Sequence, residues 1–166
     1  ALNGSAQALL LVDQMARKFK SNQVKNAARE ALADAASALQ ISREELEDRI
    51  VPDLGFNAQM EQTLDYGARS FTVRLTPLLA LEVYDSSQKL LKKLPAPGKQ
   101  DDDAKAKQAQ ETFKQIKKQL KVVAAAQKLR LEHTFITARY WQIQAWKALF
   151  VSNPLMHQFA VGLIWG

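Results

Sequence analysis

The chain has 166 residues, of which 47% are hydrophobic and 24% charged, and it carries a formal net charge of +6 with no cysteine. This length and balance are typical of one folded domain over residues 1–166 and exclude a chain that is disordered throughout. The lack of cysteine excludes disulfides, thiolate nucleophiles and cysteine-bearing metal sites. It is compatible with a reducing cytoplasm, where we expect the protein to act.

The positive charge is concentrated in one part of the chain. Residues 1–70 hold 8 basic and 10 acidic side chains, residues 71–103 hold 5 of each, and residues 104–139 hold 9 basic and 2 acidic ones. The basicity is therefore a property of one segment, and an anionic partner would be expected to bind there.

The ends of the sequence are unusual for a complete protein. The chain starts without Met and ends on the apolar run Leu163-Ile164-Trp165-Gly166. We therefore expect a fragment of a larger bacterial protein, with the remaining parts of that protein as its first partner. No apolar run approaches the roughly 20 residues that cross a bilayer, so we expect no membrane contact.

Two helices are predicted for residues 1–40. The first covers residues 5–20, and the second follows the Ser21-Asn22 turn and ends near Leu39. The expected buried face of the second helix consists of Val24, Ala28, Ala31, Leu32, Ala35 and Leu39. A tight connection makes the two helices an antiparallel, HEAT-like pair, which suggests the last repeat of a helical solenoid.

Residues 41–60 are predicted to form a short helix and a turn. Ser42 and Glu45 have the spacing of a capping box, and Pro52 ends the helix.

In residues 61–95 the spacing of the apolar side chains changes to a period of two. The alternating apolar residues are Phe71, Val73, Leu75, Leu79, Leu81 and Val83. With a turn at 85–88 and a returning segment at 89–94, this pattern predicts a small antiparallel β-meander.

A linker over residues 96–102 precedes a helical part over residues 103–166. Asp101, Asp102 and Asp103 are expected to cap a long basic helix that ends near Ala138. Its inner face should hold Phe113, Ile116, Leu120, Val123, Gln127 and Leu131. An aromatic helix over 139–151 should bury Tyr140, Ile143, Trp146 and Phe150. Asn153 and Pro154 should start a last helix, whose buried face is expected to hold Met156, Phe159, Ala160 and Leu163. The predicted fold class is α+β and mostly helical.

Several stretches together are similar to a known family. They are Ala16-Arg17-Lys18-Phe19-Lys20, Arg43-Glu44-Glu45-Leu46-Glu47-Asp48-Arg49-Ile50-Val51-Pro52-Asp53-Leu54-Gly55, Asp65-Tyr66-Gly67, Lys93-Leu94-Pro95-Ala96-Pro97, Arg130-Leu131-Glu132, Asn153-Pro154-Leu155-Met156 and Leu163-Ile164-Trp165. They resemble the conserved domain of unknown function in MolR-like proteins, which are large bacterial proteins named for molybdate metabolism regulation. The resemblance implies a regulatory setting and brings no catalytic or ligand-binding residue with it.

The main candidate site is a lysine stripe on the long helix. Its members are Lys107, Lys114, Lys117, Lys118, Lys121 and Lys128. Residues seven apart drift by only about 20° around a helix, so the stripe could follow a phosphate backbone for roughly 30 Å. The interpretation we favour is the solvated back of an amphipathic helix. The stripe lacks interleaved aromatic residues, which argues against sequence-specific readout of nucleic acid.

For the other residues whose side chains could bind a ligand or act in catalysis, we favour a structural role. They are the cluster Arg17, Lys18, Lys20 and Lys25 as helix surface, His133 and His157 as structural histidines, Glu44, Glu45, Glu47, Asp48 and Asp53 as helix-start carboxylates, and Trp141, Trp146 and Trp165 as packing residues. Trp141 lies off the aromatic face and is expected to pack on a part of the larger protein.

The sequence favours a non-catalytic interaction or regulatory module with no cofactor and no metal. The alternatives are a nucleic-acid or other polyanion binder that uses the lysine stripe, and an uncharacterised enzyme. The nucleophile elbow, the phosphate-binding glycine loop and the dinucleotide fingerprint are all missing from the sequence.

Overall fold

The computed structural model describes residues 6–164, except for the side chains of residues 6, 7, 17 and 18. The chain packs as two compact units, residues 1–52 and residues 53–166. The predicted α+β, mostly helical class is confirmed, because helices and one small antiparallel sheet make up the described elements. The single domain over residues 1–166 stays a prediction.

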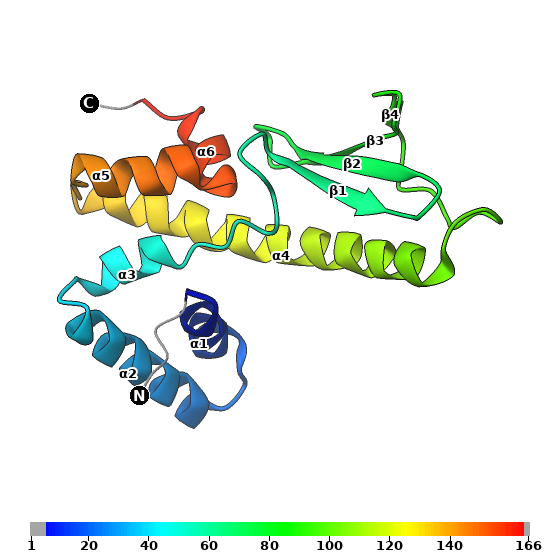
Figure 1. Cartoon of the computed structure of the whole chain (residues 1–166). Helices are drawn as coiled ribbons and strands as arrows, with labels where there is room; N and C mark the ends of the chain where they lie inside the picture. Colours follow the sequence, from blue (N-terminus) through cyan, green and yellow to red (C-terminus); the bar gives the residue numbers. More distant parts are fainter. Residues whose placement is uncertain (1–5, 165–166) are drawn as a thin grey trace. The chain divides into compact units, whose positions relative to one another are not determined.

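The described residues of the first unit form the helices α1 (Ala6–Lys18), α2 (Asn22–Ala38) and α3 (Arg43–Arg49) (Figure 1). Helices α1 and α2 pack together across a short connection, as predicted. The core that these helices share with α3 holds Leu9, Ala16, Ala28, Leu32, Ala35, Ala36, Leu46 and Ile50. The alanines allow the helix backbones to approach closely. Leu39 was expected in this core but is exposed, because α2 ends one residue earlier.

Both ends of the α2–α3 connection are capped. Gln40 has a positive φ of 54°, and its N–H donates to the Ser37 carbonyl while the next N–H, that of Ile41, donates to Ala36. This is the Schellman pattern of helix ends. The Ser42 hydroxyl accepts from the Glu45 N–H at 3.1 Å, which confirms half of the capping box. The carboxylate of Glu45 accepts from Arg49 at 2.7 Å.

The second unit begins with a four-stranded antiparallel meander in the order β1-β2-β3-β4. The strands are β1 (Glu61–Asp65), β2 (Ser70–Leu75), β3 (Leu81–Tyr84) and β4 (Leu90–Leu91). The predicted meander is confirmed, and its register pairs Leu64 with Phe71 and Val73 with Val83. Leu79 does not extend β3 as expected. It occupies the turn before that strand with a φ of 56°.

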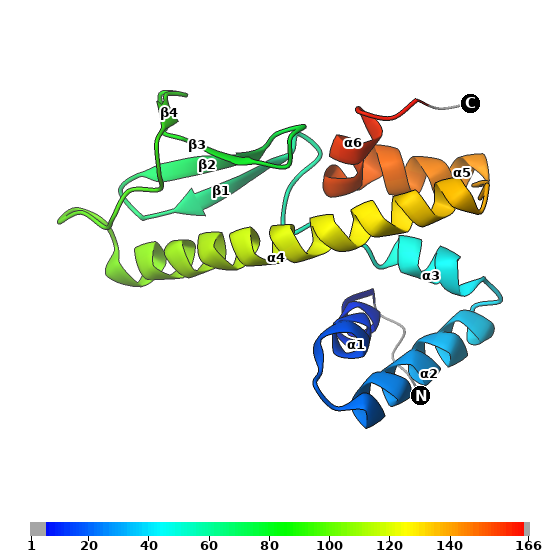
Figure 2. The ribbon, with the colours of Figure 1, turned by 180° about the vertical axis from the view of Figure 1, so that it is seen from behind.

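The buried face of the sheet lies on the first half of a long helix, α4 (Asp103–Ile136), as Figures 1 and 2 show. Ala106 and Ala109 are buried at the start of α4, and the predicted inner residues Ile116, Leu120 and Gln127 are buried further along. Small residues at the first turns let β1 approach the helix axis. The sheet therefore fixes which face of α4 points inward.

The C-terminal segment differs from its prediction. The aromatic helix starts at α5 (Ile143–Trp146) and continues as a π-helix, η1 (Lys147–Ser152). Leu149 and Phe150 of η1 are buried in the core. Tyr140 and Ile143, which were expected on the inner face, are exposed, because residues 139–142 are not helical.

The last helix, α6 (Pro154–Ala160), starts as predicted. The Asn153 side chain accepts from the Met156 N–H at 3.0 Å, and Pro154 occupies the first turn. Its buried face is wrong in part, because Phe159 and Ala160 are only half-buried. Leu163 lies beyond the end of the helix and is exposed.

Helix α4 ends in a second Schellman pattern. Ala138 has a φ of 48°, its N–H donates to Phe135, and the Arg139 N–H donates to Thr134. Glycine is the usual residue at this position, since an L side chain is strained by about 1–2 kcal/mol there.

We therefore predict that Ala138→Gly raises the free energy of unfolding by about 1 kcal/mol, because the left-handed strain is relieved. The matched control is Ala125→Gly on the exposed face of α4, which should lower it by about 1 kcal/mol. Urea denaturation followed by tryptophan fluorescence measures both, since all three tryptophans lie within residues 53–166. A loss of stability in both variants would contradict the left-handed conformation of Ala138.

Candidate interaction surfaces on the long helix

The start of α4 is fastened to the β1–β2 turn by backbone and capping contacts. The Asp102 side chain accepts from the Lys105 N–H at 2.9 Å, as a helix N-cap, and the Asp102 N–H donates to the Tyr66 carbonyl at 2.9 Å. Gly67 has a φ of +87°, and a Cβ there would lie 2.9 Å from the Asp102 Cβ. The turn can approach the helix this closely only with glycine.

An ion pair reinforces the same junction. The Arg69 guanidinium donates to both carboxylate oxygens of Asp101, at 2.8 Å and 3.0 Å, and also to the Ala96 carbonyl at 3.0 Å. The Asp101 side chain is only 2% exposed. Asp101 was expected to be a helix-start carboxylate, but it joins the linker to the hairpin. Arg69, followed by the Gly98 N–H, holds the pKa of Asp101 below its ordinary value of 3.8.

Tyr66 completes this junction from inside the sheet. Its ring is fully buried, stacks edge-on against Phe71 at 4.9 Å, and its hydroxyl donates to the Pro95 carbonyl at 2.9 Å. Burial raises the pKa of the Tyr66 hydroxyl. On the outside, Lys105 pairs with Asp65 at 2.8 Å, which lowers the pKa of that carboxyl. We call the contacts of residues 65–69 with residues 95–105 the junction.

All six lysines of the predicted stripe lie on α4 with exposed side chains. At about 100° per residue, Lys107, Lys114, Lys118, Lys121 and Lys128 span about 80° of the helix circumference. Lys117 lies at the edge of this arc, and its ammonium is 4.9 Å from the centre of the Phe113 ring. Within the part of the chain that the structure describes, the stripe makes one long ion pair, Lys114 to Glu111 at 3.9 Å.

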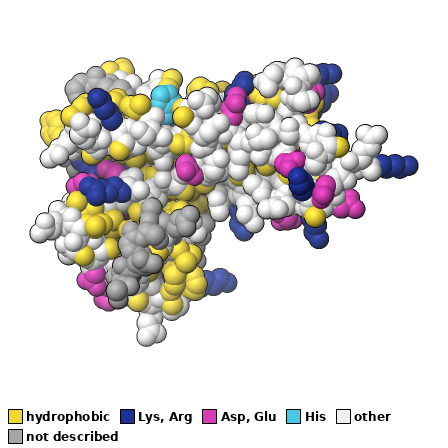
Figure 3. Space-filling model, in the orientation of Figure 1, with side chains coloured by type: hydrophobic (Ala, Val, Ile, Leu, Met, Phe, Trp, Pro, Cys, Tyr) yellow, Lys and Arg dark blue, Asp and Glu magenta, His cyan; other side chains and the backbone are white. Residues whose placement is uncertain are grey.

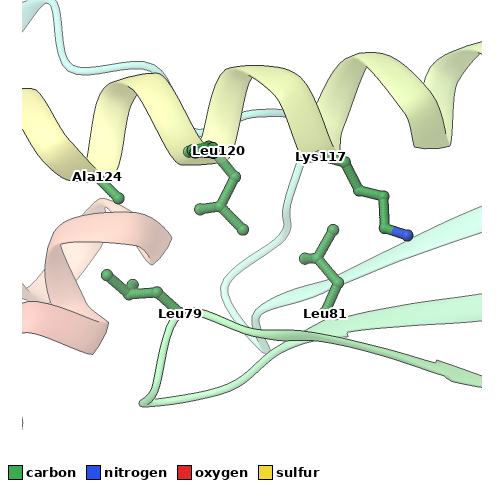
Figure 4. Close-up of a pocket in the computed structure, with 6 residues that line it drawn as sticks. Leu79, Leu81, Lys117, Leu120 and Ala124 are labelled. Atoms are coloured by element: carbon green, nitrogen blue, oxygen red, sulfur yellow. The ribbon is translucent and has the colours of Figure 1, made fainter.

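A groove of about 310 Å³ lies between the β2–β3 turn and α4. It is lined by Leu79, Leu81, Lys117, Leu120, Lys121 and Ala124 (Figure 4). Figure 4 shows Leu81 and Leu120 pointing toward each other across the groove, with Lys117 beside them. The sequence did not reveal this groove, because its two walls come from segments about forty residues apart that only the fold brings together.

A further surface lies where α4 ends and the chain turns into α5. Its exposed apolar side chains are Leu129, Phe135 (89% exposed), Ile136 (80%), Tyr140 (88%) and Ile143 (60%). We call these five residues the apolar end. Figure 3 shows hydrophobic side chains at the α5 end of the unit, whereas basic and acidic side chains are interspersed at the end that carries the sheet.

The remaining candidates lie apart from these surfaces. His133 is exposed, and the ring of His157 lies 3.2 Å from the Phe150 carbonyl, in the structural role expected of it. Trp141 stacks edge-on against Phe150 at 5.3 Å, and the Arg139 guanidinium lies 4.9 Å from its ring centre. Trp141 therefore packs within its own unit, contrary to the expectation that it packs on another part.

The basic cluster near the first connection is described only in part, because the side chains of Arg17 and Lys18 lie outside the described residues, whereas Lys20 is exposed and Lys25 half-buried. Trp165 also lies outside them.

The acidic candidates are used locally. Glu44 and Glu45 lie in the first turn of α3, as expected of helix-start carboxylates, and Glu47 pairs with Arg43 at 3.2 Å. The prediction is wrong for Asp48, which is buried near the end of α3, and for Asp53, which follows the helix and accepts from the Gly55 N–H at 2.8 Å. Among residues 6–164, no group of three or more metal-binding side chains could hold an ion. None of the helices in that range is long and apolar enough to span a bilayer.

Comparisons with known proteins give a family of unknown function. The family model of the domain of unknown function DUF4132 matches residues 89–166, which include all of α4. The chain is 32% identical over 165 residues to the uncharacterized protein YehI of Escherichia coli (strain K12). That alignment covers 99% of this chain and 14% of YehI. No solved structure matches the chain. Neither match carries the MolR name, so that resemblance stays a prediction.

The junction makes stability depend on pH. A carboxyl whose pKa is lowered on folding contributes stability at neutral pH and loses it as the pH falls through its folded value. We predict that the free energy of unfolding falls as the pH drops below 3.8, the ordinary pKa of this carboxyl, and that it falls less in Asp101→Asn. Arg69→Gln should weaken the dependence similarly, because it removes the main cause of the shift. Urea denaturation at several pH values measures this, and an unchanged pH dependence in Asp101→Asn would contradict the assignment.

Proposed function

We propose that the chain is a non-catalytic docking module that holds further segments of a longer protein against its apolar end. The observation that carries this proposal is the exposure of Phe135, Ile136 and Tyr140, which are each at least 80% exposed within six residues of one another. Large apolar side chains that are this exposed and lie close together in the chain are typical of interaction sites. Burying one such side chain yields about 1.5–3 kcal/mol, so a partner that covers several of them gains substantial affinity.

The length of the relative supports this choice of occupant. The chain corresponds to only 14% of YehI, so in that protein the matched region is joined to much longer stretches of polypeptide. A segment tethered in the same chain has a high effective concentration and needs little intrinsic affinity to dock. The regulatory role implied by the MolR-like resemblance would act through this docking, and we expect it in the cytoplasm.

The local use of charged side chains supports a non-catalytic role. Glu45 and Glu47 of α3 and Asp65 and Asp101 of the junction are held in ion pairs, and the groove is lined by aliphatic and lysine side chains. General acid–base catalysis needs titratable groups that converge on one place. The alternative of an uncharacterised enzyme would be established by a turnover that is traced to this chain.

Hydroxyl-radical footprinting tests the docking proposal through side-chain accessibility. Phe135 and Tyr140 should be modified readily in the isolated chain and protected several-fold when the chain stands in full-length YehI in place of the region that it matches. Leu90, which is exposed on β4 and remote from the apolar end in sequence, provides the internal control. Equal modification of the apolar end in both proteins would refute docking.

A second candidate function is the binding of nucleic acid or another polyanion by the lysine stripe. The supporting observation is that five exposed lysines share about 80° of the circumference of α4, with a single long ion pair to Glu111. Lysines on one face of a straight helix can neutralise successive phosphates and release counterions.

Fluorescence anisotropy with duplex DNA and RNA across a salt series tests this function. Replacing Lys107, Lys114, Lys118 and Lys121 by Gln should reduce the slope of log K against log salt by about 3–4, since each phosphate contact contributes about 0.9. The matched control, with Lys89, Lys92, Lys93 and Lys99 replaced by Gln, removes the same charge from outside α4 and should change the slope much less. A flat salt response, or equal losses in the two variants, would end the proposal.

A further inference from the structure

The groove beside the lysine stripe combines an apolar floor with a basic rim. Leu120 is buried and Leu81 is half-buried in its walls, and Leu79 closes the end formed by the β2–β3 turn. Lys117 and Lys121 line the groove and also belong to the stripe. An apolar contact and a cationic contact are therefore available to one bound molecule within a few ångströms of each other.

The turn that carries Leu79 is firmly built. The Leu79 N–H donates to the Thr76 carbonyl at 2.9 Å, and the Thr76 hydroxyl accepts from the Ala80 N–H at 3.2 Å. Leu79 itself has a φ of 56°, a conformation in which Asn or Gly would be less strained than Leu. The side chain at this position is thus held toward the groove by a capped turn.

We propose that this groove binds an acidic amphipathic segment of a protein, with apolar side chains seated on Leu79, Leu81 and Leu120 and carboxylates facing Lys117 and Lys121. The carboxylate contacts rest on the proposed anion-binding role of the lysine stripe, and the apolar contacts do not. Charge complementarity selects the occupant, because an apolar groove with a lysine rim favours a segment with aliphatic residues on one face and acidic residues beside them.

Two other classes of anion fit the groove less well. Nucleic acid gains affinity from bases stacked on aromatic rings, and none of the six lining residues is aromatic. At about 310 Å³, the groove is at the lower limit of cavities that enclose a small molecule, so a long acyl chain would stay partly in water. A protein segment needs to insert only one or two side chains.

Fluorescence anisotropy with three matched peptides tests the inference on the whole chain. The first is a fluorescein-labelled helical peptide of Glu with Leu at positions i, i+3, i+4 and i+7. The second has Ala in place of each Leu, and the third has Gln in place of each Glu. The first peptide should bind at least about tenfold more tightly than either control, because only it supplies both contacts.

The variant Leu79→Asn removes the apolar wall and keeps the turn, since Asn tolerates positive φ. It should weaken binding of the first peptide at least about fivefold and leave binding of poly-glutamate unchanged. The matched control is Leu78→Asn, because Leu78 is 90% exposed and does not line the groove. It should leave the affinity for every probe unchanged.

The outcomes separate this inference from the proposed binding of polyanions by the lysine stripe. Poly-glutamate and duplex DNA that fail to bind would overturn the polyanion role of the stripe. If they bind while the first peptide gains nothing from its leucines, or is insensitive to Leu79→Asn, only the groove inference is overturned. Displacement of the peptide by an equimolar amount of oleate would also overturn it, because it would assign the groove to a lipid anion.

Discussion

The second unit depends on one polar junction, at which the β1–β2 turn is fastened to the start of α4. Arg69 and Asp101 form its ion pair, and Asp102 both caps the helix and donates its N–H to Tyr66. A helix of 34 residues extends for roughly 50 Å, far more than four short strands can cover. Fixing its first turn against the sheet therefore fixes which side of the whole helix faces outward.

The outward sides of α4 then differ along its length. The lysine stripe follows the part that the sheet packs against, with the groove at its edge, and the apolar end lies where the helix stops. Lysines in this setting keep their ammonium groups in water at little cost, whereas Phe135 and Tyr140 cannot avoid exposing apolar surface. This contrast makes the apolar end the stronger indication of a binding partner, and it is why docking is proposed ahead of polyanion binding.

Periodicity predicted most elements, because it depends only on local spacing. The period of two in Phe71, Val73 and Leu75 located a strand correctly, and the Asn153-Pro154 pair located the start of α6. The same reasoning was wrong for Tyr140 and Ile143. A left-handed residue at Ala138 ends α4 and residues 139–142 are not helical, and apolar spacing does not encode such a break.

The candidate surfaces were less predictable than the fold. The lysine stripe follows from lysines that repeat every seven residues, so their common face on α4 was foreseen, and the role of the stripe stays a prediction. The junction and the groove depend on contacts between residues 65–81 and residues 95–124, which a single sequence does not pair. Asp101 illustrates this, because three contiguous aspartates read as caps until the fold brings Arg69 to the first of them.

Native-state amide hydrogen exchange tests the central role of the junction most directly. In the Arg69→Ala variant, amides in the first turns of α4 after the N-cap should exchange at least about tenfold faster than in the unaltered chain. Amides of α6 should keep their rates. Unchanged exchange at the start of α4, or an equal increase throughout residues 53–166, would contradict the claim that this contact sets the position of the helix.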